Sequence, residues 1–217
     1  MNRALATTVL VSAALLISSS AAAEPAGWTD YHPSRTLFST GWQISEPIGS
    51  LHDYVGTTSF RGLTFDFRSM VVPDISVGLR FSWNRYNQNQ SQVQQQTSSG
   101  GTISGPVFHY ADQFGLSAIG HYYFGDKRRD TTFVPYVGLG LGGAWSNSYQ
   151  QTVDLGFSQN GFYFLAQPEL GLNINLARGE TTAALTLAVL YNYTTASFRE
   201  VSNAQAITET VGFTFAY

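Results

Sequence analysis

Apolar and polar residues alternate in eight segments of the chain. In the clearest of them, Ile75, Val77, Leu79, Phe81 and Trp83 alternate with small or polar residues. A period of two places successive side chains on opposite faces of a β-strand, so each segment predicts a strand with one apolar face. The segments cover residues 38–45, 62–68, 75–84, 113–124, 136–145, 162–174, 185–193 and 210–217.

The length of the segments suits a membrane crossing. A tilted strand needs about 9–11 residues to span a bilayer, and we expect every strand to have about this length. The predicted fold class is therefore all-β, an eight-stranded antiparallel up-and-down transmembrane β-barrel. Its apolar faces meet lipid, and the residues expected there include Leu79, Phe81, Leu139, Leu141, Leu187 and Phe213.

The connections between the segments give a second signal. Three are turn sequences with Pro, Asp or Gly, namely "VVPD", "GDKRRDT" and "ARGE", and they alternate with four longer connections at residues 46–59, 87–106, 146–161 and 194–206. Outer-membrane barrels have short periplasmic turns and longer external loops. In a soluble β-sandwich, short and long connections are not expected to alternate in this way. With both termini in the periplasm, every long loop is external.

Composition supports an all-β chain with many turns whose surface meets something other than water. Charged residues make up 12% of the 217 residues, aromatic residues 14%, and Gly occurs 21 times. The only lysine is Lys127. A net charge of −3 does not indicate a protein that binds nucleic acid. The absence of Cys excludes a disulfide framework and a thiolate metal site.

The first 23 residues have the features of a secretory signal peptide. Arg3 precedes an apolar run that ends near Ile17, and Ala21 and Ala23 fit a cleavage site before Glu24. The alternative is an N-terminal membrane anchor, but the run is short for a spanning helix. We expect residues 1–23 to be removed, residues 24–36 to form a periplasmic segment and residues 37–217 to form the barrel.

Aromatic residues are expected in two girdles, because their rings favour the headgroup layers of a membrane. The external girdle is predicted to contain Trp83, Trp145, Tyr191 and Tyr193, and the periplasmic girdle Phe67, Tyr122 and Phe124. Pro168 falls in the middle of a strand, where it removes a ladder donor, and predicts a local bulge.

The last strand, "TVGFTFAY", resembles the C-terminal assembly signal of Gram-negative outer-membrane barrels. By this resemblance Phe213, Phe215 and Tyr217 are read by the barrel-insertion machinery. The stretches "ISVGLRFSW", "PYVGLGLGGAW" and "QPELGL" are similar to strands of the outer-membrane β-barrel domain family, the small eight-stranded barrels like OmpA, OmpX and OmpW. The resemblance implies an integral protein of the cell outer membrane. Members of the family serve as adhesins, structural proteins and small channels.

Four charged side chains are predicted to face the inside of the barrel: Asp66, Arg68, Arg80 and Glu169. An eight-stranded barrel is only wide enough to be filled by side chains, so a charge inside must be paired or hydrated. We expect Glu169 to pair with Arg80 or Arg68 and to block the lumen. Gly138, Gly140 and Gly142 are expected to leave room for the guanidinium groups and for inward tyrosines. The network is either a plug or a gate with two pairings.

No catalytic, metal or cofactor site is predicted. The four histidines form no constellation with a nucleophile, and His52 with Asp53 is a weak pair of metal ligands. The Gln-rich segment 87–105 is expected to be a solvent-exposed loop, or else a hairpin that extends the strands. Three functions remain open: a monomeric structural or surface-interaction barrel with an unknown loop ligand, a narrow gated channel or carrier of small hydrophobic molecules, and a lipid-modifying enzyme.

Overall fold

The computed structural model describes residues 36–96, 102–124, 132–152, 155–176, 182–198 and 201–216. The predicted signal peptide, all but the last residue of the predicted periplasmic segment, and Tyr217 lie outside these residues. Within the described part, no helix is long and apolar enough to cross a membrane.

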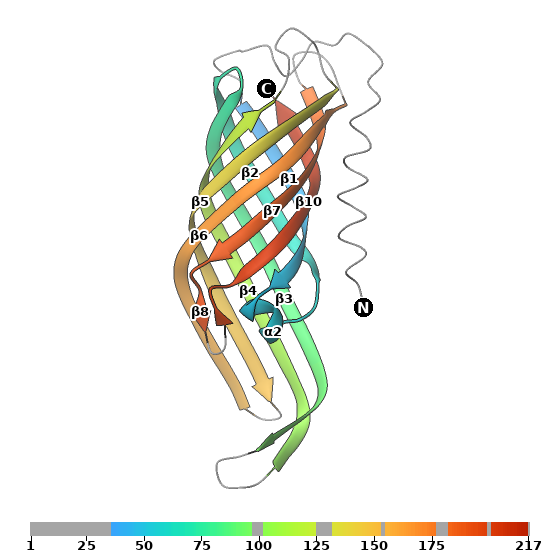
Figure 1. Ribbon diagram of the computed structural model, residues 1–217, viewed down its shortest axis with the longest axis vertical. Coiled ribbons are helices and arrows are strands. Elements are labelled where there is room, and N and C mark those ends of the chain that lie inside the picture. The colour runs from blue at the N-terminus through green and yellow to red at the C-terminus, as the bar shows by residue number, and fades with distance from the viewer. Residues whose placement is uncertain are drawn as a thin grey trace.

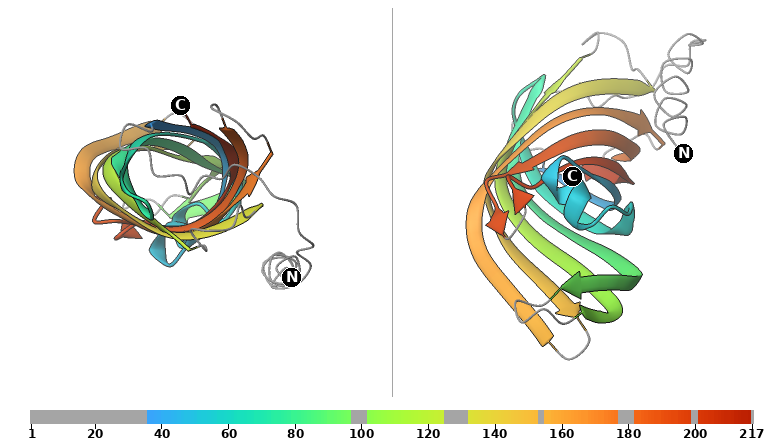
Figure 2. Two further views of the ribbon diagram at one scale, coloured as in Figure 1. Left: turned by 90° about the horizontal axis from the view of Figure 1, so that it is seen from above. Right: turned by 60° about the horizontal axis from the view of Figure 1, so that its bottom comes forward.

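Eight strands close into a barrel in which every neighbouring pair is antiparallel (Figure 1; Figure 2, left). Each strand pairs with its sequence neighbours, and the first pairs with the last, so the predicted up-and-down topology is confirmed. The barrel strands are β1 (Thr36–Ile48), β2 (Ser59–Val72), β3 (Ile75–Gln96), β4 (Thr102–Tyr123), β5 (Phe133–Thr152), β6 (Leu155–Asn175), β7 (Thr182–Thr194) and β10 (Gln205–Ala216).

Alternation decides which side chains face outward. Leu79, Leu139 and Phe213 are about half exposed, at 57%, 48% and 47%, while the inward residues between them are buried or partly buried. Phe81 and Leu141 are exposed on the same wall, and Leu187 is half-buried there. An apolar wall of this extent around a closed barrel fits lipid and does not fit water.

All eight barrel strands are longer than the predicted 9–11 residues; β1, β2, β7 and β10 have 12 to 14 residues. β3, β4, β5 and β6 have 20 to 22 residues, so the prediction is clearly wrong for them. The two hairpins they form continue beyond the barrel at the end opposite to the turn between β2 and β3 (Figure 1). The Gln-rich segment, expected first as a loop, is therefore strand over its described residues 87–96 and 102–105, because each strand supplies the other's backbone partners.

Two smaller elements lie at the same end of the barrel (Figure 2, right). Between β1 and β2 the chain forms the short helix α2 (Ser50–Tyr54). Between β7 and β10 it forms a small hairpin of β8 (Ser197–Phe198) and β9 (Val201–Ser202).

The predicted bulge at Pro168 is wrong. β6 keeps one continuous register with β5, in which Pro168 lies opposite Leu139. With β7 the ladder stops after Ala166 and resumes at Glu169 without a change of register. The missing N–H thus interrupts the pairing on one side only, and no extra residue is needed.

Candidate functional site

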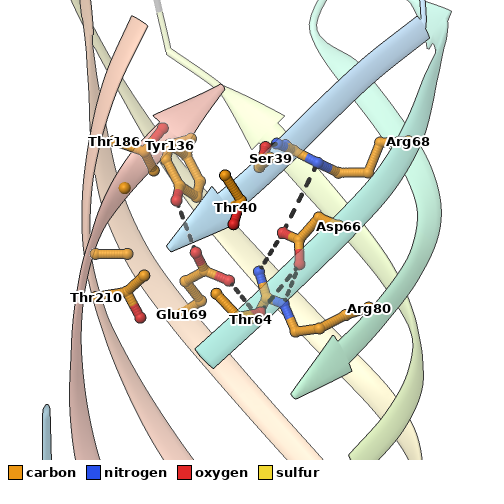
Figure 3. Close-up of a pocket in the computed structure, with 12 residues that line it drawn as sticks. Ser39, Thr40, Thr64, Asp66, Arg68, Arg80, Tyr136, Glu169, Thr186 and Thr210 are labelled. Carbon is orange, nitrogen blue, oxygen red and sulfur yellow. Dashed lines mark hydrogen bonds and ion pairs between the residues drawn. The ribbon is translucent and has the colours of Figure 1, made fainter. Parts of the chain in front are cut away.

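The four predicted lumen charges meet inside the barrel (Figure 3). Asp66 and Arg68 come from β2, Arg80 from β3 and Glu169 from β6, and each is 5% exposed or less. Their inward direction follows from the alternation on the three strands.

Arg80 is the centre of this charge network. Its Nε and Nη2 donate to the two oxygens of Asp66 at 2.8 and 2.7 Å, and its Nη1 lies 2.7 Å from Oε2 of Glu169. One guanidinium therefore holds two carboxylates, which suits the planar fork of Arg. The sequence left Arg68 and Arg80 as possible partners of Glu169, and in the structure Glu169 pairs with Arg80.

The register of β2 and β3 places Asp66 directly opposite Arg80. The turn has only two residues, Pro73 and Asp74, and the register shifts by one residue at Val71. Without that shift, inward residues of β2 would face outward residues of β3. The two-residue turn and the alternation together are a signal of this pairing in the sequence, although the pair of Asp66 with Arg80 was not among the predictions.

Arg68 pairs with neutral groups rather than with Glu169. Its Nη1 donates to Nδ1 of His121 at 2.6 Å and to the hydroxyl of Tyr123, and its Nη2 donates to Ser39. Asp66 is 4.0 Å away. Because an arginine can only donate, His121 accepts at Nδ1 and is the neutral tautomer with its proton on Nε2. The network then carries two positive and two negative charges and is neutral.

Glu169 has two further neighbours. Tyr136 donates to its Oε1 at 2.7 Å, and Nε2 of His121 lies 3.5 Å from its Oε2. His121 stacks on Tyr136 with ring centroids 4.7 Å apart. The alternation in the sequence places His121 on the inward face but predicts no role for it. Its inward position opposite Gly138 is the signal that was available.

Gly138, Gly140 and Gly142 on the inner face of β5 lie against other groups than the sequence predicted. A Cβ on Gly138 would lie 2.8 Å from the ring of His121, and one on Gly140 would lie 3.2 Å from Gln167. At Gly142 a Cβ would meet the backbone of β4. The expectation that these glycines leave space for guanidinium groups is therefore wrong. Tyrosine rings lie over glycines of β6 instead: Tyr136 over Gly171, Tyr163 over Gly161 and Tyr149 over Gly156.

A layer of neutral polar side chains lies above the charge network, on the side of the projecting hairpins. Gln167 accepts from Ser117 at 3.0 Å and donates to Asn192 at 2.7 Å, and Asn192 donates to Thr208 at 2.6 Å. Ser45 hydrogen-bonds to Thr208 and donates to Asn84, and Asn84 in turn donates to Gln43. The layer crosses the lumen from β4 to β3 through β6, β7, β10 and β1.

Apolar side chains close both ends of the lumen. Toward the projecting hairpins, Leu51 and Tyr54 of α2 pack with Tyr86, Ala111 and the segment before β10; the buried members of this outer cap are Leu51, Tyr54, Val55, Tyr86, Ala111, Ala196, Val201, Ala204 and Ala206. Toward the short turns, the buried cluster comprises Leu37, Met70, Tyr123, Val134, Tyr136, Ala184, Ala188, Leu190 and Ala216.

Side chains fill the lumen at the level of the charge network. The cavity bordered by Asp66, Arg80 and Glu169 has a volume of about 20 Å³, which is room for about one water molecule. Among the described residues, no group of three or more His, Asp or Glu side chains is placed to hold a metal ion.

The predicted girdle residues lie on the outward face. Trp83 of β3 pairs with Phe114, Phe114 with Trp145, and Trp145 with Phe162. The predicted girdles do not include Phe114, Phe162 or Trp42, although all three are exposed and follow the alternation. The other outward girdle residues are Tyr191, Tyr193, Phe67, Tyr122 and Phe124, and Phe213 and Phe215 of the predicted assembly signal share the outward face of β10.

No protein-family model and no curated protein matches the sequence. Among solved structures, the chain is similar to Ail, the attachment invasion locus protein of Yersinia pestis, at 10% identity and a TM-score of 0.51, over 86% of this chain and 100% of Ail. It is similar to Ail in complex with the heparin analogue sucrose octasulfate at 13% identity and a TM-score of 0.50, over 86% of this chain and 100% of that one. The outer membrane protein OprG from Pseudomonas aeruginosa is 15% identical, with a TM-score of 0.46, over 86% of this chain and 97% of OprG.

At these identities the likeness concerns the fold. The chain has the fold of the small eight-stranded outer-membrane barrels. This fold and the apolar outer wall together make it an integral barrel of the outer membrane.

Proposed function

We propose that the chain is a structural or surface-interaction barrel whose lumen is closed and whose contacts are made by the part that projects from the membrane. The observation that carries this is the filling of the lumen at four successive levels: an apolar cluster, the charge network, the neutral polar layer and the outer cap. Side chains from all eight strands take part in this filling.

The projecting hairpins are the surface that we propose for contact with a partner. Binding residues concentrate on segments held by a rigid scaffold, and here the scaffold is the barrel. Between Tyr86 and Ala111 the sequence contains no Asp, Glu, Lys or Arg. Ail was solved with a sulfated sugar analogue. Because this hairpin offers no cation, we expect its partner to be recognised through amide and hydroxyl groups rather than through sulfate.

A gated channel is the second candidate, and one observation favours it. Asp66 lies 2.7 Å from Arg80 and 4.0 Å from Arg68, so it has two possible arginine partners. An exchange between them is the kind of two-state pairing that a gate requires. A carrier of small hydrophobic molecules would need the outer cap to open. Loss of a modified lipid in a deletion strain would favour the enzymatic alternative.

Planar-bilayer recordings on the purified barrel test the proposal. We expect no ionic current from the wild type and none from Glu169→Ala, because the polar layer and both apolar clusters remain. Glu169→Gln is the matched control, since it removes the charge and keeps the volume. Stable current from the wild type would contradict the closed lumen. Current that arises in Glu169→Ala alone would support the gate instead.

We also propose that residues 1–23 are a signal peptide, that residues 24–36 precede the barrel in the periplasm, and that the mature barrel is a monomer inserted by the barrel-insertion machinery. Sequencing of the mature N-terminus tests the cleavage site before Glu24.

A further inference from the structure

The positive charges of the described chain are divided between two places. Of its four arginines, Arg68 and Arg80 are buried in the lumen, and Arg61 and Arg85 both lie on the outer wall. Arg61 comes just before Gly62 on β2, and Arg85 just after Asn84 on β3, and Gly62 and Asn84 are a cross-strand pair. The two arginines are therefore neighbours on the outside of the barrel.

A β-bulge creates this position for Arg61. Between the pairs Gln43–Gly62 and Ser45–Ser59, β1 advances by two residues and β2 by three. The extra residue makes both Phe60 and Arg61 exposed instead of only one of them. The buried Ser59 holds the bulge, since its hydroxyl accepts from the backbone N–H of Arg61 at 3.2 Å and donates to the backbone carbonyl of Arg85.

Arg85 is fixed in orientation. Its Nε and Nη2 donate to the two oxygens of Asp112 at 2.6 and 2.9 Å, and its Cζ lies 5.8 Å from the ring centroid of Trp83. These bonds leave Nη1 for another acceptor, and 42% of the side chain is exposed. Asp112 balances one of the two positive charges. Among the described residues, no ion pair engages the guanidinium of Arg61, and Glu46, the exposed carboxylate of the neighbouring strand β1, accepts from Thr58.

Large apolar side chains surround this arginine corner. Trp42 is 58% exposed and Phe60 60% exposed, and the indole N–H of Trp42 donates to the carbonyl of Phe60 at 2.8 Å. Trp83 stacks with Phe114 at a centroid distance of 6.4 Å. Two cations beside exposed rings, on a wall that faces lipid, match an amphipathic ligand with an anionic head and acyl chains.

We propose that Arg61 and Arg85 bind the phosphate of a phosphorylated lipid in the adjacent leaflet, with its acyl chains against Trp42 and Phe60. Arginine suits phosphate because its fork donates two parallel hydrogen bonds. The site lies at the end of the barrel that carries the projecting hairpins, which is the outer leaflet when the termini are periplasmic. It involves neither the lumen nor the hairpin tips, so it does not depend on the proposed function.

Native mass spectrometry of the barrel titrated with lipid A tests this site. The arms are lipid A with both phosphates, dephosphorylated lipid A, and phosphorylated lipid A in the presence of inorganic phosphate. We expect the wild type to retain the phosphorylated lipid and Arg61→Gln to bind it at least about fivefold more weakly, the effect of removing one cation near an anionic lipid surface. Dephosphorylated lipid should bind the wild type weakly, and inorganic phosphate should not compete.

Asn203→Asp is the matched control. It lowers the net charge by one, as Arg61→Gln does, at an exposed position with φ of 60° that Asp tolerates as Asn does. An equal loss in both variants, equal binding by Arg61→Gln and wild type, or equal binding of the dephosphorylated lipid would overturn the proposal. Displacement of the lipid by inorganic phosphate would overturn its assignment to a lipid. The dephosphorylated arm needs no variant, so it decides the question even if Arg61→Gln folds poorly.

Discussion

At the scale of single residues, each charged side chain in the lumen has identified partners. Arg80 neutralises Asp66 and Glu169 together, and Arg68 uses neutral acceptors on β4 and β1. A charge inside such a narrow barrel is costly unless it is paired, because the cavity beside the network has room for only about one water molecule. The network is thus one unit, and the removal of any member leaves at least one other side chain without a partner.

Glu169→Ala should lower the free energy of unfolding by about 3–5 kcal/mol, because it leaves Arg80 with one carboxylate and Tyr136 without an acceptor. The combined replacement Arg80→Met and Glu169→Leu should cost less, since it removes one charge of each sign and leaves Asp66 with Arg68, 4.0 Å away. Denaturant titration in detergent micelles compares the two variants. A larger loss in the double variant would contradict this account.

At the scale of elements, β4 and β5 approach each other closely because of one glycine. A Cβ on Gly142 would lie 2.1 Å from the backbone oxygen of Leu116 and 2.5 Å from the Cα of Ser117. At Gly140 the nearest atoms are side-chain ends, at 3.2 Å. Side-chain ends move easily, whereas a paired backbone does not. The same strand therefore contains one position that tolerates a methyl group and one that does not.

Gly142→Ala should destabilise the barrel by about 1–3 kcal/mol, because the β4 backbone must shift. Gly140→Ala, two residues away on the same inner face, is the control and should cause a smaller loss. The heat needed to convert the compact band to the unfolded band on a gel measures both. Equal losses in the two variants would show that backbone approach is not the cause.

At the scale of the whole molecule, closure determines the architecture. β1 pairs with β10 along the full length of both strands, so no sheet edge is left in the membrane. The strands that continue beyond the barrel form its projecting part, and α2 closes the lumen beneath them (Figure 2, right). The last strand is therefore needed to close the wall.

Replacement of Phe215 and Tyr217 by Ser should reduce insertion into the outer membrane, because the barrel-insertion machinery is expected to read the terminal aromatic residues. Phe215 faces outward on β10, whereas Tyr217 lies outside the described residues. Thr214→Ser changes an inward position and serves as the control. Heat-modifiable protein in outer-membrane fractions is the measurement, and unchanged levels in the first variant would refute the role of these residues.

The sequence by itself determined the number of strands, their order, the outward and inward faces and the direction of the four lumen charges, because a period of two is a local property of the chain. Only the tertiary structure decided the partners. Asp66 faces Arg80 through a bulge at Val71, and His121 reaches Glu169 across Gly138. Strand length was also decided there, because β3 to β6 continue wherever a neighbouring strand satisfies their backbone groups, and polar Gln-rich segments give no local sign of it.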